Sequence, residues 1–595
     1  MRTPHYLKAN NSSEYPRHCV WLDTETHPEA VSPVLNKHVL DFGWACYRRR
    51  SRGHKWSKPQ WFRFTTLDDF WNWITEHIGP KEAYTLFAHN GSFDLPVLDA
   101  FNWLQDNDWQ LKNAVIESPP IILKWSKEGR SIKFIDTLNI WRTSLAEIGK
   151  TIGMEKLDTD YNWDDIENAD LYCQRDVEII MQACIEWFDF IREHDLGGFA
   201  PTLASQAVRA YRHRFMPHKI LIDDNEAALA MARAAYHGGR TECFYVGEFD
   251  GPFYQLDINS MYPDIMHKEM MPTKLIGLYR RVQHLELGKL LKDYCVVAEV
   301  TLDVDVPAFP QYTDGKLLFP VGEFSTVLTT PELQYALDMG YVTSIDRVAI
   351  YEQAVIFKDY VDYFYPLRQE YKKAGNDSAS YMTKILMNSL YGKFGQRGMV
   401  YETIEQVNSK AINTWSEIDA DTMEVIRYRQ FAGMVQQLTD EPESRDSHPA
   451  IAAHVTAYAR MEMWNIYQQA GLDNCYYSDT DCVVVNQTGF HKLGNLIDEH
   501  TLGMLKLEQT ISHASIRGPK DYQFDSTERI KGVRKSALWL APNTVEQESW
   551  AGLKGLMAKG DLSAPTTKTI VKHLKRQYTK GLVTDSGRVV PYKVG

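Results

Sequence analysis

The sequence predicts a multidomain chain of the α/β and α+β classes. Its 595 residues are several domains' worth, and 44% of them are hydrophobic, which is enough for more than one core. In the first 200 residues, apolar runs that end in carboxylates are followed by a stretch of helical spacing, which favours an α/β unit. Strand-like runs and helical stretches then follow each other up to the C-terminus, which favours α+β units.

The composition excludes several classes of protein. The eight cysteines are scattered without Cys-x-x-Cys spacing, so neither a zinc site nor a disulfide framework is indicated. No apolar run approaches the ~18 residues that a membrane span needs, and no signal peptide is recognised. We therefore expect a soluble, intracellular protein.

Charge is unevenly distributed along the chain. The net charge is −13, yet residues 509–595 contain 15 Lys and Arg against 7 Asp and Glu, a net charge of +8 that leaves −21 for the rest. A basic C-terminal region is expected to bind DNA, and the acidic remainder of the chain is expected to contain carboxylates that bind metal ions.

Four carboxylates of the first 200 residues stand where they could hold metal ions. Asp23 and Glu25 follow a short apolar strand, and Asp94 closes a second apolar run. Tyr172 and Asp176 lie at i and i+4 on one face of a helical stretch. These four carboxylates can converge on two metal ions, with the tyrosine orienting the attacking water. Taken singly, each is more simply a surface carboxylate.

A short glycine-containing loop follows this unit. Its sequence is Tyr236-His237-Gly238-Gly239-Arg240. Adjacent glycines let a backbone approach a partner closely, and their amides can face phosphates. The alternative is a simple connecting loop.

Two further stretches deliver carboxylates at the ends of predicted strands. Asp257 ends an apolar strand, and residues 260–263 turn the chain into the next element. Asp479 and Asp481 lie in a tight turn between two short apolar strands. Two carboxylates about 4 Å apart repel by roughly 4 kcal/mol at an effective dielectric of 20, and Mg²⁺ would remove that cost. An Asp-rich hairpin turn without a metal is the alternative.

A helical stretch presents polar groups on one face. Lys384, Asn388 and Tyr391 fall at i, i+4 and i+7. We expect an earlier helix to start at Pro366 with Arg368 and Lys372 on one face, to end at Gly375-Asn376, and Ser378 to cap the second helix. Carboxylates for metals and a basic helical face for a triphosphate make a site for phosphoryl transfer.

The order of these stretches resembles motifs A, B and C of the family B DNA polymerases. The N-terminal carboxylates resemble the Exo I, II and III motifs of the DEDD 3′–5′ exonucleases, in the variant with Tyr four residues before the last Asp. The resemblance implies an RNase H-like exonuclease domain followed by a right-hand domain of palm, fingers and thumb. Met261 stands where leucine is usual, and Ser478 precedes the first aspartate of motif C.

The resemblance assigns a role to each of these residues. Asp257 and Asp479 would bind two Mg²⁺ with the support of Asp481, and two more Mg²⁺ would lie in the exonuclease site. In both sites Mn²⁺ would be able to substitute for Mg²⁺. Tyr262 would reject a ribose 2′-hydroxyl, Tyr391 would close on the nascent base pair, and Asn388 would help to hold the nucleotide. The triphosphate would meet Arg368, Lys372 and Lys384.

Other residues match the elements of this family that contact DNA. Asn90 and Phe93 resemble its single-strand contacts, and Lys156 resembles a lysine that assists exonucleolysis. Tyr236, Gly238 and Gly239 resemble the Tyr-x-Gly-Gly element, which contacts DNA or a priming protein. Lys520 and Tyr522 resemble the Lys-x-Tyr motif that holds the primer terminus.

The chain resembles most closely the protein-primed family B polymerases of phages and linear plasmids. This implies an exonuclease domain at 1–200, palm at 201–272 and 449–508, fingers at 357–397, thumb at 509–595, and insertions at 273–356 and 398–448. The implied partners are primer–template DNA, deoxynucleoside triphosphates and a terminal protein, with a monomer in the host cytoplasm and no membrane. The second insertion could also be a flexible surface loop. We expect Lys568–Lys580 to form a thumb helix along the duplex, with a solvated basic helix as the alternative.

Three alternatives remain open from the sequence. One is a family B polymerase that does not use protein priming, another is a replication scaffold that binds DNA without catalysis, and the third is an exonuclease with a binding appendage. The presence of every expected carboxylate disfavours the scaffold. The set of Lys384, Asp257 and Asp479 disfavours the exonuclease without polymerase activity.

Overall fold

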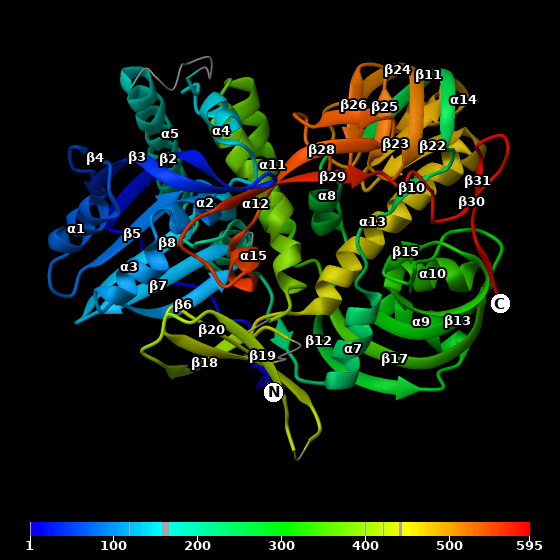
Figure 1. Cartoon of the computed structure of the whole chain (residues 1–595). Helices are drawn as coiled ribbons and strands as arrows, with labels where there is room; N and C mark the ends of the chain where they lie inside the picture. Colours follow the sequence, from blue (N-terminus) through cyan, green and yellow to red (C-terminus); the bar gives the residue numbers. More distant parts are fainter. Residues whose placement is uncertain (1, 118, 158–165, 399, 421, 440–442) are drawn as a thin grey trace.

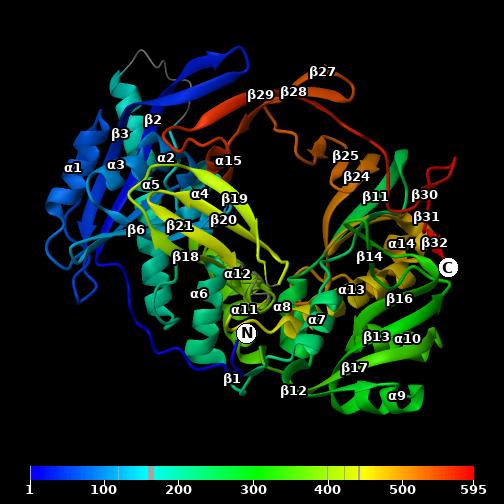
Figure 2. The same cartoon turned by 60° about the horizontal axis from the view of Figure 1, so that its bottom comes forward.

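Four sheets of four or more strands organise the chain in the computed structural model, which describes residues 2–117, 119–157, 166–398, 400–420, 422–439 and 443–595. Figure 1 shows the N-terminal sheet on the left, the seven-stranded and five-stranded sheets on the right, and long helices between them. Figure 2 shows the same elements arranged as a ring.

The N-terminal sheet is mixed and forms the α/β unit that the sequence predicts. Strand β2 pairs with β3 in antiparallel register and with β5 in parallel register, and β5 pairs with β8 in parallel register. Its strands are β2 (His18–Ser32), β3 (Leu35–Arg49), β4 (Gln60–Phe64), β5 (Ala83–Ala88), β6 (Gln110–Ile116), β7 (Ile121–Lys127) and β8 (Arg130–Asp136). Its helices are α1 (Leu67–His77), α2 (Gly91–Val97), α3 (Ala100–Asp106), α4 (Leu145–Thr151) and α5 (Ile166–Glu193).

Helix α5 covers the face of this sheet formed by β2 and β3. Cys173, Val177, Ile180, Cys184 and Ile191 are all buried, and their spacing of three, four and seven residues places them along one stripe of the helix. Burial of this stripe fixes how the helix is rotated about its axis. The rotation in turn decides where Asp176 points.

A seven-stranded antiparallel sheet carries the central carboxylates. Its strand order is β10-β22-β23-β11-β24-β25-β26. The bounds are β10 (Thr241–Cys243), β11 (Gly247–Ile258), β22 (Cys475–Asp479), β23 (Cys482–Asn486), β24 (Leu505–Gly518), β25 (Asp521–Phe524) and β26 (Thr527–Ile530). Helix α13 (Pro449–Ala470) packs against α7 (Glu226–Ala235), α8 (Met261–Lys268) and α14 (Gln487–Lys492). It is buried on nearly every side, and its buried residues are mostly apolar, as expected of a helix within the core.

The segment at 273–356 is folded, as expected from its length. It forms a sheet of order β12-β17-β13-β16-β32, in which the last strand comes from the C-terminus. The strands are β12 (Met271–Arg280), β13 (Cys295–Val304), β16 (Val321–Thr329), β17 (Val342–Ala354) and β32 (Lys593–Val594). Helices α9 (His284–Asp293) and α10 (Thr330–Asp338) and the hairpin of β14 (Gln311–Thr313) and β15 (Lys316–Leu318) complete it.

Two helices follow, and their starts correct the sequence prediction. Helix α11 (Lys358–Lys373) begins eight residues before Pro366, because burial of Tyr360 and Phe364 extends the helix towards its N-terminus. Pro366 is exposed, so water can satisfy the carbonyl that the proline leaves without an N–H. Helix α12 (Asp377–Phe394) is capped by Asn376, whose side chain accepts a hydrogen bond from the N–H of Ala379 at 3.0 Å. Ser378 lies inside the helix.

The interval after α12 is a small antiparallel sheet. It contains β18 (Val400–Gln406), β19 (Asn413–Ile418), β20 (Val425–Phe431) and β21 (Met434–Thr439) in the order β18-β21-β20-β19. In the described part of this interval, a folded sheet therefore replaces the flexible loop that composition alone allows.

The C-terminal region is built of strands, and the prediction of a helix at Lys568–Lys580 is wrong. Strand β29 (Thr566–His573) pairs with β28 (Thr544–Trp550) on one side and with Leu35–Lys37 of β3 on the other. A run of Thr, Ile and Val with partners on both sides favours a strand over a helix. Together with β27 (Leu538–Ala541), these strands extend the N-terminal sheet, and Figure 2 shows them closing the ring.

Shorter elements connect these units. They are β1 (His5–Tyr6), α6 (Leu203–Ala210), a π-helical turn (Tyr211–Phe215), β9 (Leu221–Ile222), α15 (Leu553–Ala558), β30 (Leu582–Val583) and β31 (Val589–Val590). Across the described ranges, no helix is long and apolar enough to cross a membrane.

Candidate active sites

The fold brings the four N-terminal carboxylates together. Asp23 and Glu25 lie on β2, Asp94 on α2 and Asp176 on α5. The hydroxyl of Thr24 donates a hydrogen bond to Asp94 at 2.9 Å, and the Lys156 ammonium forms an ion pair with Asp176. The Oδ1 atom of Asp176 is buried and has no hydrogen-bond partner in the part of the chain that the structure describes.

The pKa values of these carboxylates show that their charges are close and poorly solvated. Burial and then the charges of Asp176 and Asp94 raise the pKa of Asp23 well above its ordinary value. Burial and then Asp176 raise the pKa of Glu25 to about 8. Burial raises the pKa of Asp94 to about 7, against the hydrogen bond from Thr24. Without a cation the site therefore retains protons near neutral pH.

The donor set suits a divalent cation. Ligand atoms of Asp23, Glu25 and Cys173 all lie within 4.8 Å of one another. Hard oxygen donors predominate, as Mg²⁺ prefers. Burial alone would lower the pKa of Lys156. The negative charge of the neighbouring Asp176 outweighs this effect and raises the pKa of the lysine.

Because these carboxylates bind protons more tightly in the folded protein, the stability of the metal-free protein should depend on pH. Glu25 and Asp94 have pKa values near 4 in an unfolded chain and about 8 and about 7 in the folded one. Raised pKa values give stability that is complete below about pH 4 and is lost as the pH rises through 7 and 8. We expect the melting temperature of the metal-free protein to fall over this window, and the gain from Mg²⁺ to grow over it. Thermal melts from pH 5 to 9 with and without Mg²⁺ measure both.

A double variant, Glu25→Gln with Asp94→Asn, is the control for this experiment. It should flatten the pH dependence of the melting temperature and remove most of the gain from Mg²⁺. A gain from Mg²⁺ that is equal at every pH in the unchanged protein would contradict this assignment.

The residues predicted to contact single-stranded DNA flank the same site. Asn90 has a left-handed backbone (φ 75°) at the start of α2, and its N–H donates to Asp136 at 3.0 Å. The ring of Phe93 meets the ring of Trp550 edge-on, with centroids 5.4 Å apart. Lys156 lies over the ring of Tyr172, 4.4 Å from its centroid. The sequence analysis missed Asp136, which ends an apolar strand in the same way as the other carboxylates.

The second carboxylate site lies where β11 meets the β22–β23 hairpin. Asp257 is directly opposite Cys482 on one side and Lys506 on the other. Thr480 takes a left-handed conformation (φ 67°) in the tight turn, and the N–H of Ile258 donates to the backbone oxygen of Asp481 at 2.9 Å. The predicted strand at Asp257, the hairpin and the helix at Lys384 are thereby confirmed.

The electrostatics of this site also suit a cation. Burial raises the pKa of Asp257, and burial followed by the charge of Asp257 raises that of Asp481 to about 6. The Oδ1 atom of Asp257 is buried and lacks a hydrogen-bond partner among the residues that the structure describes.

One pocket of about 430 Å³ joins these carboxylates to the basic helices. Asp257 and Asp481 line it from the sheet, and α11 and α12 contribute Arg368, Lys372, Lys373, Lys384 and Asn388. Lys506, Glu508, Glu499 and His500 also line it and were missed. Lys506 lies opposite Asp257 on the neighbouring strand, and strand register cannot be read from one sequence.

The two carboxylates of the turn differ in their surroundings. Asp481, rather than Asp479, lines the pocket together with Asp257. Asp479 accepts a hydrogen bond from the hydroxyl of Thr241 at 3.0 Å, and its Oδ1 lies 3.4 Å from the ammonium of Lys520. Asp479 is the last residue of β22, whereas Asp481 lies in the turn before β23.

Two of the tyrosines predicted to bind the nucleotide are not in the lining of this pocket and pack against each other. The rings of Tyr262 and Tyr391 have centroids 4.8 Å apart. The guanidinium of Arg368 donates to the hydroxyl of Ser260 at 3.1 Å, which connects α11 to the start of α8. Tyr522 packs against Tyr477 with ring centroids 5.1 Å apart, and the hydroxyl of Tyr477 accepts a hydrogen bond from the N–H of Lys520 at 3.0 Å.

The Tyr236–Arg240 loop packs directly on the turn that contains Thr480. A Cβ atom at Gly239 would lie 2.8 Å from the Cγ2 atom of Thr480, so only glycine fits there. The Arg460 guanidinium donates to the backbone oxygens of His237 at 2.9 Å and Gly238 at 3.2 Å. Tyr236 lies against Gly395, at the end of α12.

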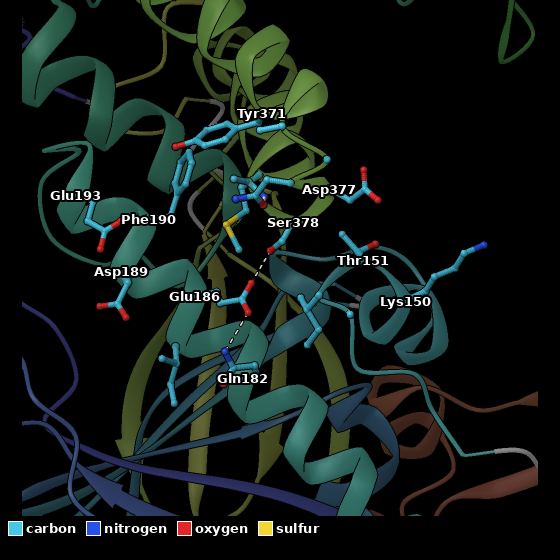
Figure 3. Close-up of a pocket in the computed structure, with 18 residues that line it drawn as sticks. Lys150, Thr151, Gln182, Glu186, Asp189, Phe190, Glu193, Tyr371, Asp377 and Ser378 are labelled. Atoms are coloured by element: carbon cyan, nitrogen blue, oxygen red, sulfur yellow. Dashed lines mark hydrogen bonds between the residues drawn. The ribbon is translucent and has the colours of Figure 1, made fainter.

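A larger pocket of about 630 Å³ lies between α5 and the junction of α11 with α12 (Figure 3). Its charged lining is mostly acidic, with Glu186, Asp189, Glu193 and Asp377 against Lys150. The hydroxyl of Ser378 donates to Glu186 at 2.6 Å, as Figure 3 shows. None of the predicted catalytic carboxylates lines this pocket, so we regard it as a junction between the α/β unit and α12.

Comparison with known proteins adds a family and a fold. The family model for DNA polymerase type B, organellar and viral, matches residues 152–470. A probable DNA polymerase of Ascobolus immersus is 28% identical over 441 residues, which cover 70% of this chain and 33% of that protein. The DNA-directed DNA polymerase of Enterobacteria phage PRD1 is 24% identical over 480 residues, 78% of each chain. The chain spans about a third of the length of the Ascobolus, Neurospora and Podospora relatives that it matches.

The fold is shared with a solved structure. Phi29 DNA polymerase complexed with primer-template DNA and incoming nucleotide substrates superposes with a TM-score of 0.68. The match covers 94% of this chain and all of that one at 16% sequence identity. At this identity the likeness establishes the fold alone.

Proposed function

The chain belongs to the organellar and viral type B DNA polymerases, and from this premise we propose that it is a DNA-directed DNA polymerase with a 3′–5′ proofreading exonuclease. The observation that carries the proposal is the pocket that joins Asp257 and Asp481 to Arg368, Lys372 and Lys384. A metal-bound triphosphate carries negative charge on its phosphates and positive charge on its metal ions. The cationic side chains of the pocket suit the phosphates, and the carboxylates suit the metal ions.

In this proposal the residues of the pocket divide the work of nucleotide addition. Lys384, Arg368 and Lys372 bind the triphosphate, and Asn388 holds the nucleotide. Asp257 and Asp481 hold the cations, and Asp479 orients Lys520 at the primer terminus through their 3.4 Å contact. Tyr391 closes on the nascent base pair above Tyr262.

The exonuclease site lies on the N-terminal sheet. Asp23, Glu25, Asp94 and Asp176 hold the cations, and Tyr172 orients the attacking water beside Lys156. Asn90 and Phe93 position the single strand. In each site two Mg²⁺, for which Mn²⁺ can substitute, would activate the attacking oxygen and neutralise the charge on the leaving one.

Primer extension tests the proposal directly. A labelled primer–template with Mg²⁺ and the four deoxynucleoside triphosphates should give longer products, and without nucleotides the primer should shorten from its 3′ end. Binding of the primer–template without either reaction would favour a scaffold and overturn the proposal. Shortening without extension would favour an exonuclease with a binding appendage.

Tyr262 is expected to select deoxyribose. It follows Asp257 by five residues and packs against Tyr391, a position under the sugar of the incoming nucleotide. Tyr262→Val removes the ring that fills the space of a 2′-hydroxyl. We expect ribonucleotide incorporation to rise by about ten-fold or more, from the 1–3 kcal/mol of a steric pocket, while deoxynucleotide addition persists. Equal discrimination by both proteins in single-nucleotide assays would remove Tyr262 from this role.

We further propose that the enzyme replicates a linear phage or plasmid genome from a terminal protein. Support comes from the Tyr236-x-Gly238-Gly239 loop beside the catalytic turn and from two folded insertions, the sheets of 273–356 and 398–448. A priming protein must present a hydroxyl where the primer 3′-hydroxyl otherwise lies, and the first insertion offers docking surface there. The second insertion would hold the template and separate strands.

Labelled dATP, Mg²⁺, the origin end and the candidate terminal protein of the same genome test the priming proposal. Label that migrates with protein and is lost on protease treatment supports it. If only oligonucleotide primers are extended, and deletion of 398–448 leaves strand displacement unchanged, the priming and insertion roles both fail while the polymerase proposal stands.

A further inference from the structure

A cysteine lies inside the carboxylate cluster of the N-terminal sheet. The Sγ atom of Cys173, on α5, is 3.8 Å from the Oδ2 atom of Asp23 and 3.6 Å from the backbone oxygen of the same residue. Ligand atoms of Asp23, Glu25 and Cys173 are all within 4.8 Å of one another. All eight cysteines are buried, and in the part of the chain that the structure describes only Cys173 belongs to such a group. The thiol therefore borders the space where a cation of this cluster would bind.

The spacing of these atoms suits a metal ion that binds oxygen and sulfur together. Zinc ligands are arranged tetrahedrally, with zinc–sulfur bonds of about 2.3 Å and zinc–oxygen bonds of about 2.1 Å. A sulfur and an oxygen that share one zinc ion are then about 3.6 Å apart, close to the 3.8 Å between Cys173 and Asp23. Without a metal, the same separation accommodates the weak hydrogen bond of a thiol. A cation can thus replace the thiol proton with little movement of either side chain.

A second feature of the cluster also indicates a cation. The side chain of Asp176, one helical turn after Cys173, is 4% exposed. Lys156 pairs with one of its oxygens, and the other, Oδ1, has no hydrogen-bond partner within the described ranges. After burial, the charge of Asp176 raises the pKa values of Asp23 and Glu25 most, so this carboxylate lies close to both. A buried carboxylate oxygen without a partner costs free energy, which a bound cation offsets.

The cluster is open on its carboxylate side. Asp23 and Glu25 are partly exposed, whereas Cys173 is completely buried. A cation therefore passes the two carboxylates before it reaches the sulfur. On its other side Cys173 packs with Phe42 and Ala169 in a small apolar cluster. The sulfur is thus fixed as the innermost donor, and a cation can reach it without rearrangement of the core.

Different metal ions would use this donor set differently. Mg²⁺ takes oxygen ligands and would bind the carboxylates alone, whereas thiolate ligands select softer ions such as Zn²⁺. The polymerase site offers no equivalent choice. Cys482 lies opposite Asp257, but no cysteine lines the pocket, and no group of three metal-binding side chains forms there among the described residues.

We propose that Cys173 is a thiolate ligand for thiophilic divalent cations such as Zn²⁺, which Asp23, Glu25 and Cys173 bind together in place of Mg²⁺. The inference rests on the exonuclease function proposed above. Binding forms a sulfur–zinc bond, releases the thiol proton to water and changes no oxidation state. The sulfur draws the cation to the buried side of the cluster, away from the DNA phosphate. Zn²⁺ therefore blocks 3′–5′ degradation at concentrations that leave primer extension active.

Cobalt is the probe for this site, because Co²⁺ replaces Zn²⁺ and a sulfur–cobalt bond gives a charge-transfer band in the near ultraviolet that oxygen ligands do not give. Titration of the full chain with Co²⁺ should produce this band, Zn²⁺ should remove it, and excess Mg²⁺ should not. Cys173→Ser should abolish the band, while Mg²⁺ still raises the melting temperature of the variant. Its Zn²⁺ affinity should fall by about ten-fold or more, since the loss of even an outer partner of a ligand has such an effect.

Cys184→Ala is the matched control, because Cys184 is also buried on α5 and belongs to no metal-binding group of the described residues. It should retain the band. Cys173→Ala should lose the band as Cys173→Ser does, and a cooperative thermal melt shows that each variant is folded. A band that persists in both Cys173 variants, or that disappears in Cys482→Ser instead, would overturn the proposal. Binding of Co²⁺ to the unchanged protein without a band would overturn it as well.

Degradation assays separate this inference from the exonuclease function on which it rests. With Mg²⁺ present, Zn²⁺ should inhibit degradation of a labelled single strand by the unchanged protein at a concentration about ten-fold or more below that needed with Cys173→Ser. Each protein is compared with its own rate in Mg²⁺ alone. Equal sensitivity of the two proteins would refute the block by Zn²⁺. Absence of degradation in Mg²⁺, with the cobalt band present, would refute the exonuclease function and still support the thiolate ligand.

Discussion

Asp257→Asn is expected to lower primer extension by about 10³-fold or more and to leave 3′–5′ degradation of single strands nearly unchanged. Asp257 is the partly buried carboxylate that lines the same pocket as Asp481 and the cations of α11 and α12. An amide keeps the shape but lacks the charge that binds a divalent cation. Loss of several kcal/mol of charge stabilisation corresponds to about three or more factors of ten in rate.

The matched control for this variant is Asp250→Asn. Asp250 lies on the same strand, β11, but its side chain is 95% exposed and pairs with His513, which is itself half exposed. Its removal should leave both reactions unchanged. Single-turnover extension and degradation of the same labelled primer measure both effects. Extension by Asp257→Asn at more than a tenth of the normal rate would exclude this carboxylate from the catalytic centre.

Asp94→Asn should have the opposite effect, lowering 3′–5′ degradation by about 10³-fold and preserving extension. Asp94 is 2% exposed and accepts a hydrogen bond from Thr24, which an amide oxygen can also accept. The change therefore removes charge from the exonuclease cluster without leaving the threonine unpaired. The two sites use different carboxylates on different sheets, so the effects should be nearly independent.

Asp108→Asn is the control for the exonuclease, because Asp108 belongs to the same α/β unit and is 88% exposed. Misincorporation should rise in Asp94→Asn, as expected when proofreading is lost. If Asp94→Asn abolished extension while its thermal melt remained cooperative, the assignment of two separate sites would be wrong.

The sequence by itself determined the local elements that carry chemistry. Strand periodicity and turn residues placed Asp257 at the end of a strand and Asp479 and Asp481 in a hairpin, and helical spacing put Lys384 and Asn388 on one exposed face. These are effects of neighbours within a few residues. The hydrophobic pattern therefore repeats every two residues in a strand and every 3.6 residues in a helix, and it can be read without knowing the rest of the fold.

Local rules failed where packing between distant segments outweighed them. Proline and serine signals predicted the wrong starts for α11 and α12, because burial of Tyr360 and Phe364 decided the first and Asn376 supplied the cap of the second. A run of basic residues predicted a helix at Lys568, but partners on both sides made it a strand.

Only the tertiary structure decided which residues share a site. Strand register placed Lys506 opposite Asp257 and turned Asp481, rather than Asp479, towards the basic helices. Packing of the glycine loop on Thr480 placed His237 beside Tyr312, 75 residues later in the chain. Register and ring contacts of this kind depend on segments far apart in sequence. The hydrophobic pattern of one segment does not indicate which other segment it will contact. The register and the contacts between these segments are therefore known only from the folded structure.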